Sequence, residues 1–169
     1  QACALDTTGV KSWRDAYYNS LDVPPLVHPS EVTVGTSKTC ALDDTGVVCW
    51  PNNFPTSVPQ MQNPVHVAAG SCVCAIHDNG VTCWQGGWCS TDMPVLHNPV
   101  QLSVDISVCA LDDGGIACWG QVDFEEDHVP QLSNPTQVSV GGNTVCAIHE
   151  EGVACWGKYY NGQTKVPQW

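Results

Sequence analysis

The chain repeats one short phrase five times. Each copy begins at a cysteine, continues as Ala-(Leu/Ile)-(Asp/His)-x-x-Gly-(Val/Ile) and ends at a tryptophan. The copies are Cys3–Trp13, Cys40–Trp50, Cys74–Trp84, Cys109–Trp119 and Cys146–Trp156, and their first residues are 37, 34, 35 and 37 positions apart. A period of about 20 to 50 residues is typical of repeat architectures, in which each unit buries its apolar face against its neighbours. We therefore expect one domain, residues 1–169, of five stacked units.

Each unit is expected to be a small antiparallel sheet. The phrase holds a turn signal between two apolar segments, as in Asp43-Asp44-Thr45-Gly46, which is typical of a β-hairpin. An alternating apolar run precedes four of the hairpins, at Val32–Val34, Val65–Val67, Leu102–Val104 and Val138–Val140. A Val-Pro or Met-Pro step follows each phrase and predicts an edge strand or an extended connection, since Pro cannot donate to a ladder.

This pattern predicts an all-β fold, a β-propeller of five short repeats. The repeats span approximately residues 1–30, 31–63, 64–98, 99–134 and 135–169. The five tryptophans that end the phrases are predicted to pack blade against blade as core residues. They are Trp13, Trp50, Trp84, Trp119 and Trp156.

The cysteine spacing predicts hairpin disulfides. A two-residue turn at Asp44-Thr45 places Cys40 directly opposite Cys49, within the range that a disulfide needs. The same Cys-x8-Cys spacing recurs at Cys74/Cys83, Cys109/Cys118 and Cys146/Cys155. Zinc knuckles and buried cytosolic thiols are the alternatives, but zinc sites prefer two to four residues between cysteines. Disulfides are favoured, and they indicate an oxidising compartment.

Three cysteines lie outside this pattern. Cys72 and Cys89 flank the Cys74/Cys83 hairpin, and we hypothesise a bridge between them. Cys3 faces Ser12, so no disulfide is expected in the first hairpin, and Cys3 is either a thiol or bonded to something outside this chain.

The repeat resembles a known family. Val138–Gly141, the hairpin phrase with its closing Trp-Gly, and Asn161–Pro167 are similar to the regulator-of-chromosome-condensation repeat family. The likeness is to its short-repeat bacterial branch, which includes a secreted β-lactamase-inhibitory propeller. The resemblance covers essentially the whole chain and implies a β-propeller. It does not imply nucleotide exchange or chromatin binding, because a fold does not carry a function.

The segments after the tryptophans differ between repeats. In the family, ligands and partners engage loops on one face of the ring, so these segments are the expected binding patch. Their aromatic and acidic residues have the composition of a protein contact surface. The candidate residues are Tyr17, Tyr18, Phe54, Trp88, Phe124, Glu125, Glu126, Tyr159 and Tyr160. Ordinary loop variation is the alternative interpretation.

The first unit lacks its alternating strand, so one blade is expected to be incomplete. Three explanations are compatible with this gap. The chain is a trimmed piece of a longer repeat protein, or the blade tolerates the loss, or a neighbouring chain donates a strand. Donation would make the chain an assembling subunit that contacts like subunits, with an intermolecular contact near Cys3.

Composition narrows the function classes. Five Lys and Arg against 17 Asp and Glu give a net charge of −12, and the absence of a basic run disfavours nucleic acid as a partner. No apolar run is long enough for membrane insertion. The chain begins at Gln1 without a Met, which we interpret as a processed or trimmed N-terminus.

No catalytic constellation and no cofactor motif is found, so no enzyme activity is expected. No metal site is predicted; His28, His77, His97 and His149 are interpreted as exposed turn residues, and copper or zinc binding stays open as the alternative for these four and for His66 and His128. His77 and His149 are expected to be equivalent, as are His28 and His97. The favoured function is an extracellular or cell-surface protein that binds a protein partner, with the periplasm as another location. A structural subunit and a lectin-like glycan binder are the alternatives.

Overall fold

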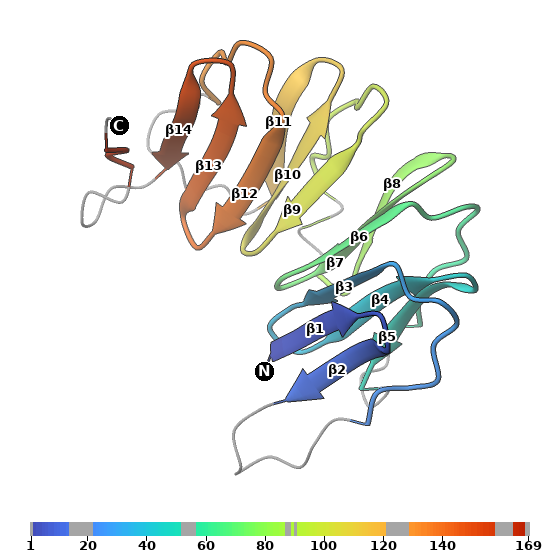
Figure 1. The fold of residues 1–169 in the computed structure, drawn as a ribbon. Helices are drawn as coiled ribbons and strands as arrows, with labels where there is room; N and C mark the ends of the chain where they lie inside the picture. Colours follow the sequence, from blue (N-terminus) through green and yellow to red (C-terminus); the bar gives the residue numbers. More distant parts are fainter. Residues whose placement is uncertain are drawn as a thin grey trace.

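The structure, a computed structural model, describes residues 2–13, 22–51, 57–86, 89, 91–120, 129–157 and 164–167. These residues form fourteen β-strands and no α-helix (Figure 1). The strands are β1 (Ala2–Asp6), β2 (Gly9–Trp13), β3 (Glu31–Val34), β4 (Thr39–Asp43), β5 (Gly46–Trp50), β6 (His66–Ala69), β7 (Val73–His77), β8 (Gly80–Trp84), β9 (Gln101–Val104), β10 (Ser107–Asp112), β11 (Gly115–Gly120), β12 (Gln137–Gly141), β13 (Thr144–His149) and β14 (Gly152–Gly157).

The strands form five antiparallel sheets, which we call blades one to five. In chain order the blades are β1-β2, β3-β4-β5, β6-β7-β8, β9-β10-β11 and β12-β13-β14. The predicted all-β fold of five short repeats is confirmed, and so is the incomplete blade, because blade one has two strands and the others have three. The Val-Pro segments 57–61 and 129–132 are not strands but connections between blades.

The hairpins have the predicted register. Cys40 lies opposite Cys49 in β4 and β5, and Cys3 lies opposite Ser12 in β1 and β2. The four hairpin disulfides Cys40–Cys49, Cys74–Cys83, Cys109–Cys118 and Cys146–Cys155 form, and so does the hypothesised bridge Cys72–Cys89. The Cys3 Sγ lies 4.0 Å from the Thr39 Oγ1 of blade two.

The Asp or His of the repeated phrase closes the hairpin turn. Asp43 Oδ1 accepts hydrogen bonds from the Thr45 amide at 2.8 Å and from its hydroxyl at 2.7 Å. His149 has the same role in blade five, where its Nδ1 accepts from the Glu151 amide at 3.4 Å. Gly46 follows with a φ of 115°, a conformation that a side chain would oppose. The phrase is thus explained by turn chemistry.

The connection before each three-stranded blade is clamped to that blade's hairpin turn. The Asn63 Nδ2 donates to the Asp78 Oδ2 at 2.6 Å, and the Asp78 amide donates back to the Gln62 carbonyl at 3.1 Å. Asn63 adopts a left-handed φ of 48°, which Asn tolerates better than most residues. The equivalent side-chain pairs are His28–Asp44, Asn98–Asp113 and Asn134–Glu150.

Neighbouring blades share apolar clusters. Trp84 of blade three packs with Leu42 and the Cys40–Cys49 disulfide of blade two. Two further clusters repeat this arrangement, Trp119 with Ile76 and Trp156 with Leu111. Each tryptophan therefore covers the face of the preceding blade, and burial of these side chains drives the stacking.

The inner strands β3, β6, β9 and β12 are also joined across blades by side chains. The Val67 amide donates to Glu31 Oε2 at 2.9 Å, and the Val138 amide donates to Gln101 Oε1 at 2.9 Å. The spacing of these pairs, 36 and 37 residues, is close to the repeat period, so each pair joins neighbouring blades. At the strand ends, the Gly35 and Gly70 backbones approach the next blade so closely that a Cβ on Gly70 would lie 2.4 Å from the Val104 carbonyl oxygen.

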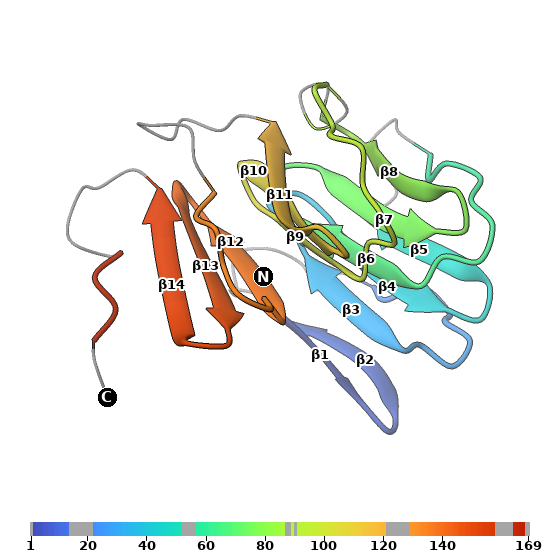
Figure 2. The ribbon, with the colours of Figure 1, turned by 90° about the horizontal axis from the view of Figure 1, so that it is seen from above.

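The five blades form an open arc. β1 contacts β3, β3 contacts β6, β6 contacts β9, and β9 contacts β12. Figure 1 shows β14 and β2 at the two ends of this row, and Figure 2 shows the blades from above, with β14 on the left. One prediction was wrong: Trp13 is not a core residue, since it is 55% exposed, whereas the other four phrase tryptophans are at most 8% exposed. The physical reason is that no blade precedes blade one within the described residues.

Candidate functional site

The predicted loop patch lies outside the described residues. Tyr17, Tyr18, Phe54, Trp88, Phe124, Glu125, Glu126, Tyr159 and Tyr160 all belong to segments that the structure does not describe, as does His128. The described strand ends show only where these segments start. They come shortly after Trp13, Trp50, Trp84, Gly120 and Gly157, the last residues of β2, β5, β8, β11 and β14. These five strand ends are equivalent in their blades to within one residue.

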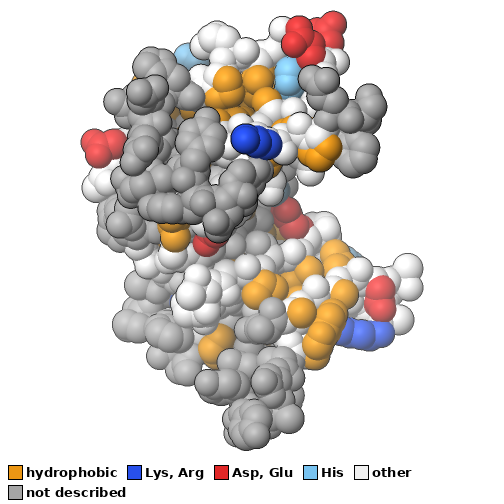
Figure 3. Space-filling model, turned by 90° about the vertical axis from the view of Figure 1, so that its left-hand side faces the viewer, with side chains coloured by type: hydrophobic (Ala, Val, Ile, Leu, Met, Phe, Trp, Pro, Cys, Tyr) orange, Lys and Arg blue, Asp and Glu red, His pale blue; other side chains and the backbone are white. Residues whose placement is uncertain are grey.

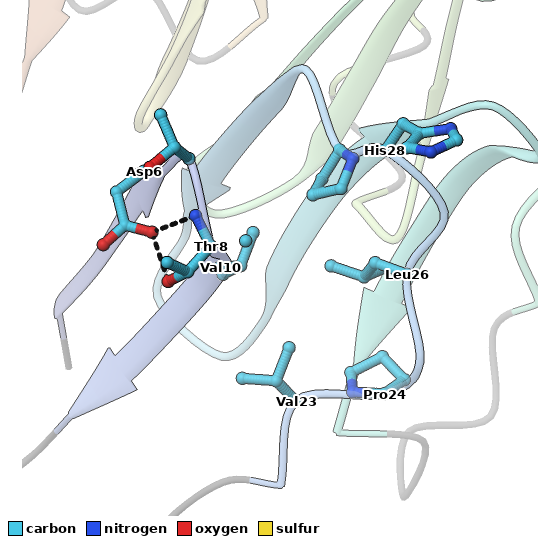
Figure 4. A pocket seen from close by; sticks show the side chains of 10 residues that line it. Asp6, Thr8, Val10, Val23, Pro24, Leu26 and His28 are labelled. Atoms are coloured by element: carbon cyan, nitrogen blue, oxygen red, sulfur yellow. Dashed lines mark hydrogen bonds between the residues drawn. The ribbon is translucent and has the colours of Figure 1, made fainter.

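A cavity lies beside the hairpin turn of blade one (Figure 4). It has a volume of about 620 Å³, and the β1-β2 turn faces the connection 23–29 across it. Its apolar wall is formed by Val10, Val23 and Leu26, and the polar edge by Asp6 and Thr8. Equivalent cavities in blades two and four measure about 200 and 70 Å³.

The difference in size has a packing explanation. In blade two, Val47 of the hairpin and Val58 and Met61 of the connection all pack against one buried apolar cluster. In blade four, Ile116 and Leu132 pack against another in the same way. Val10, Val23 and Leu26 belong to none of the clusters formed by the described core residues. The blade-one cavity can therefore accommodate a small apolar group.

The side chain of Asp6 at the cavity edge is strongly favoured in its ionised form. The pKa of Asp6 falls to about 2, first because the Thr8 hydroxyl donates a hydrogen bond to it, then because Lys11 and the Thr8 amide do the same. Lys11 Nζ lies 3.0 Å from Asp6 Oδ2. The equivalent oxygen of Asp43 instead accepts the Val27 amide of the preceding connection at 2.8 Å. Both oxygens of Asp6 are engaged, so this carboxylate is a turn cap and not a poised general base.

A second hollow, of about 250 Å³, lies along the inner strands β3, β6 and β9. His66 Nδ1 lies 2.8 Å from Glu31 Oε1, and His66 Nε2 lies 3.1 Å from the Leu102 carbonyl oxygen. Burial lowers the pKa of His66, but the hydrogen bonds to Glu31 and Leu102 and the charge of Glu31 outweigh it and raise the pKa above 6.5. His66 thus bridges three consecutive blades, a role that its place in an alternating run did not reveal.

The remaining described histidines are turn residues. His77 and His149 end β7 and β13 at equivalent positions, as predicted. The predicted equivalence of His28 and His97 is wrong. His28 has the left-handed φ of Asn63 and Asn98, so His97 corresponds to Val27. The two histidines look alike in the sequence because both stand beside a proline turn. Across the described ranges, no three His, Cys, Asp or Glu side chains gather in a way that could hold a metal ion.

No protein-family model and no curated protein matches the sequence. Solved structures do match the fold. The chain is similar to the ectodomain of the receptor kinase CR4 from the moss Physcomitrella patens, with a TM-score of 0.65 and 22% identity over 77% of this chain and 41% of that one. It is similar to the CRINKLY WD40 ectodomain of ACR4 from Arabidopsis thaliana, with a TM-score of 0.62 and 24% identity over 78% and 50%. It is also similar to Prp20p from Saccharomyces cerevisiae, with a TM-score of 0.64 and 19% identity over 82% of this chain and 46% of that one.

The fold is a β-propeller. At this level of identity the likeness extends to the fold alone, and the chain spans about half the length of these structures or less. A propeller repeat family fits the sequence phrase and the blades together. In the part of the chain that the structure describes, no helix is long and apolar enough to cross a membrane.

Proposed function

We propose that this chain is a non-enzymatic binding protein that works outside the cytosol and holds a protein partner on the segments after its tryptophans. One observation carries the proposal: five equivalent strand ends, fixed by a repeated scaffold, each lead into a segment of different sequence. A rigid scaffold with variable connections is the usual arrangement of binding surfaces. The aromatic residues of these segments, such as Tyr17 and Phe124, are the expected contact residues.

The location rests on the cysteines. Five disulfides are typical of an oxidising compartment, which favours an extracellular or cell-surface site, or a periplasm. Two of the similar structures are receptor ectodomains, and a third, Prp20p, has binding properties toward Gsp1p and histones. These facts support a protein-binding propeller. The bacterial short-repeat branch, with its secreted inhibitory member, is the family assignment that we propose on the sequence phrase.

Binding to a panel of purified extracellular proteins, measured by surface plasmon resonance, tests the proposal. We expect a partner whose affinity falls at least about tenfold in a Tyr17→Ser/Tyr18→Ser or Phe124→Ser variant. A Val95→Ser/Val100→Ser variant, which removes exposed apolar side chains from a connection, is the matched control and should bind like the parent. Binding that survives every segment variant would contradict the proposal, and binding to a glycan array alone would replace it with a lectin-like function.

A second candidate function, a subunit of an extracellular assembly completed by strand donation, is favoured by the two-stranded blade one. In blade two, β4 pairs with both β3 and β5, whereas β1 pairs with β2 and with no other strand of the described part of the chain. The N–H and C=O groups on the other edge of β1 can therefore accept an extended strand.

A peptide tests strand donation. The sequence of residues 97–105, the inner strand of blade four with its turn, should bind the protein and shift β1 amide resonances. A peptide with Leu102→Pro cannot complete the ladder and is the control. Equal binding of both peptides, or no shift in β1, would exclude this candidate.

A further inference from the structure

Each fully described interface between three-stranded blades has two dissimilar halves. The preceding blade contributes its hairpin disulfide and a Leu or Ile, and the following blade contributes its tryptophan and small or branched residues of its middle strand. Between blades two and three, for example, Leu42 is covered by Trp84, Val73 and Ala75. The same interface recurs between blades three and four and between blades four and five.

Blade five presents the first half of this interface to solvent. Ile148 in β13 and Val153 in β14 are both 44% exposed. Leu111, which is equivalent to Ile148 in blade four, is only 6% exposed because blade five covers it. The Cys146–Cys155 disulfide lies in the same hairpin as the two exposed side chains.

Blade one presents the second half. Trp13 is 55% exposed, whereas the equivalent Trp84 is 8% exposed. Ala4 in β1 is exposed, but Ala75 at the same position of blade three is completely buried. The space-filling view shows an indentation between the upper and lower parts of the molecule, with hydrophobic side chains on both (Figure 3). β14 and β2 lie at the two ends of the row of blades (Figure 1), so the two faces are apart within one molecule.

We propose that the last blade of one copy of this chain stacks on the first blade of a second copy. The blade-five face needs a tryptophan from a following blade, and the blade-one face needs an Ile and a hairpin disulfide from a preceding blade. A second copy supplies both in the geometry that the molecule already uses three times. The contact is heterologous, so successive copies add head to tail and form a ring or an open row. Because blade one lacks an inner strand, the contact uses the tryptophan and hairpin side of the interface.

Charge gives the association a signature. Each copy carries a net charge of −12, so copies repel one another at low ionic strength. The proposed contact is apolar, and salt does not weaken apolar burial as it screens charge repulsion. Self-association should therefore strengthen when sodium chloride is added, which is the opposite of the behaviour of a contact made by ion pairs.

Sedimentation velocity with complementary capped variants tests the proposal. Trp13→Lys blocks the first-blade face, and Ile148→Lys/Val153→Lys blocks the last-blade face. The parent chain should grow in average mass from low micromolar to near-millimolar concentration. Each capped variant alone should stay monomeric, because it has only one intact face. An equimolar mixture should form a dimer through the intact last-blade face of one variant and the intact first-blade face of the other. This dimer should grow no further, because its two outer faces are both blocked. All three substituted residues are exposed, so the variants keep the disulfides and the packed blades.

The controls separate this contact from the proposed binding function. Val95→Lys places a charge on an 83% exposed residue outside both faces and should associate like the parent. The Tyr17→Ser/Tyr18→Ser variant should lose partner binding and keep self-association. A parent chain that stays monomeric throughout, capped variants that associate as well as the parent, or a mixture that yields no dimer would each overturn the proposal. Trp13→Ser, with circular dichroism as the check on folding, guards against a variant that simply unfolds.

Discussion

The carboxylate of Glu31 in β3 lies 2.8 Å from Nδ1 of His66 in β6 and so joins the inner strands of blades two and three. The other ring nitrogen of His66 reaches the Leu102 carbonyl of blade four. The protonated imidazole can donate both hydrogen bonds at once. The full set of hydrogen bonds that His66 makes to the blades on either side therefore depends on one proton.

This proton predicts a fall in stability as the pH rises. The pKa of His66 is raised in the folded protein, mainly by the hydrogen bond to Glu31, against the opposing effect of burial. The stabilisation is then fully present below the unfolded pKa of about 6.5 and is lost as the pH rises through the higher folded value. Urea unfolding between about pH 5.5 and pH 8.5, without reductant, should show this slope.

The fall in unfolding free energy with rising pH is due to His66 if it disappears in the His66→Asn variant and weakens in the Glu31→Gln variant. His28→Asn is the matched control, because Asn occupies the equivalent position in three other connections and keeps the side-chain clamp. A slope that persists in His66→Asn, or that disappears in His28→Asn, would contradict this assignment.

The Asn63–Asp78 clamp predicts a second effect on stability. Asn63→Ala removes the 2.6 Å hydrogen bond and places alanine in a left-handed conformation, so we expect a loss of about 1–2 kcal/mol of unfolding free energy. Asn63→Gly removes the bond but accepts the conformation, and should lose less. Thermal unfolding by calorimetry measures both, and equal losses would show that the left-handed φ costs nothing here.

The features that follow from local periodicity could be predicted from the sequence. The two-residue turn determines the hairpin register, and the register places Cys40 opposite Cys49, so the disulfides follow from spacing alone. Trp13 could not be placed in this way, because its phrase equals those of the other tryptophans and its exposure depends on a neighbouring blade. The role of His66 could not be predicted either, since its partner Glu31 lies one repeat away. The equivalent position of blade four holds Gln101, a different residue type, which joins blades four and five.

Of the candidate site, the sequence indicated the segments but not the surfaces around them. The blade-one cavity exists because Val10, Val23 and Leu26 do not close together as their counterparts do. The cavity results from a difference in packing, and such a difference cannot be predicted from the sequence when one apolar residue replaces another. The Asn98–Asp113 clamp did have a sequence signal, an Asn-Pro step about fifteen residues before an acidic turn residue.

The Cys72–Cys89 bridge predicts a large loss on removal. It closes a longer loop than the hairpin disulfides, 17 residues against 9, and both sulfurs are buried. The Cys72→Ala/Cys89→Ala variant should lose about 3 kcal/mol, and the loss should exceed that of Cys146→Ala/Cys155→Ala, whose ends are already neighbours in a hairpin. Trp119, whose indole N–H donates to the Cys89 carbonyl at 2.8 Å, reports the change by fluorescence. Peptide mapping that finds Cys72 joined to another cysteine would contradict the basis of this prediction.

Gly70 and Gly141 predict opposite results for the same substitution. Gly70 directly follows the inner strand β6 and Gly141 ends the inner strand β12. An alanine Cβ at Gly70 would lie 2.4 Å from the Val104 carbonyl oxygen and 2.5 Å from the Asp105 Cα, whereas at Gly141 it would meet nothing within 4 Å. Backbone atoms cannot yield as a flexible side chain does, so Gly70→Ala must push blade four away from blade three. We expect a loss of about 1–3 kcal/mol in urea unfolding for Gly70→Ala, and a change within about 0.5 kcal/mol for Gly141→Ala. Similar losses at the two positions would mean that strand conformation, and not the approach of the next blade, requires glycine at the end of the inner strand.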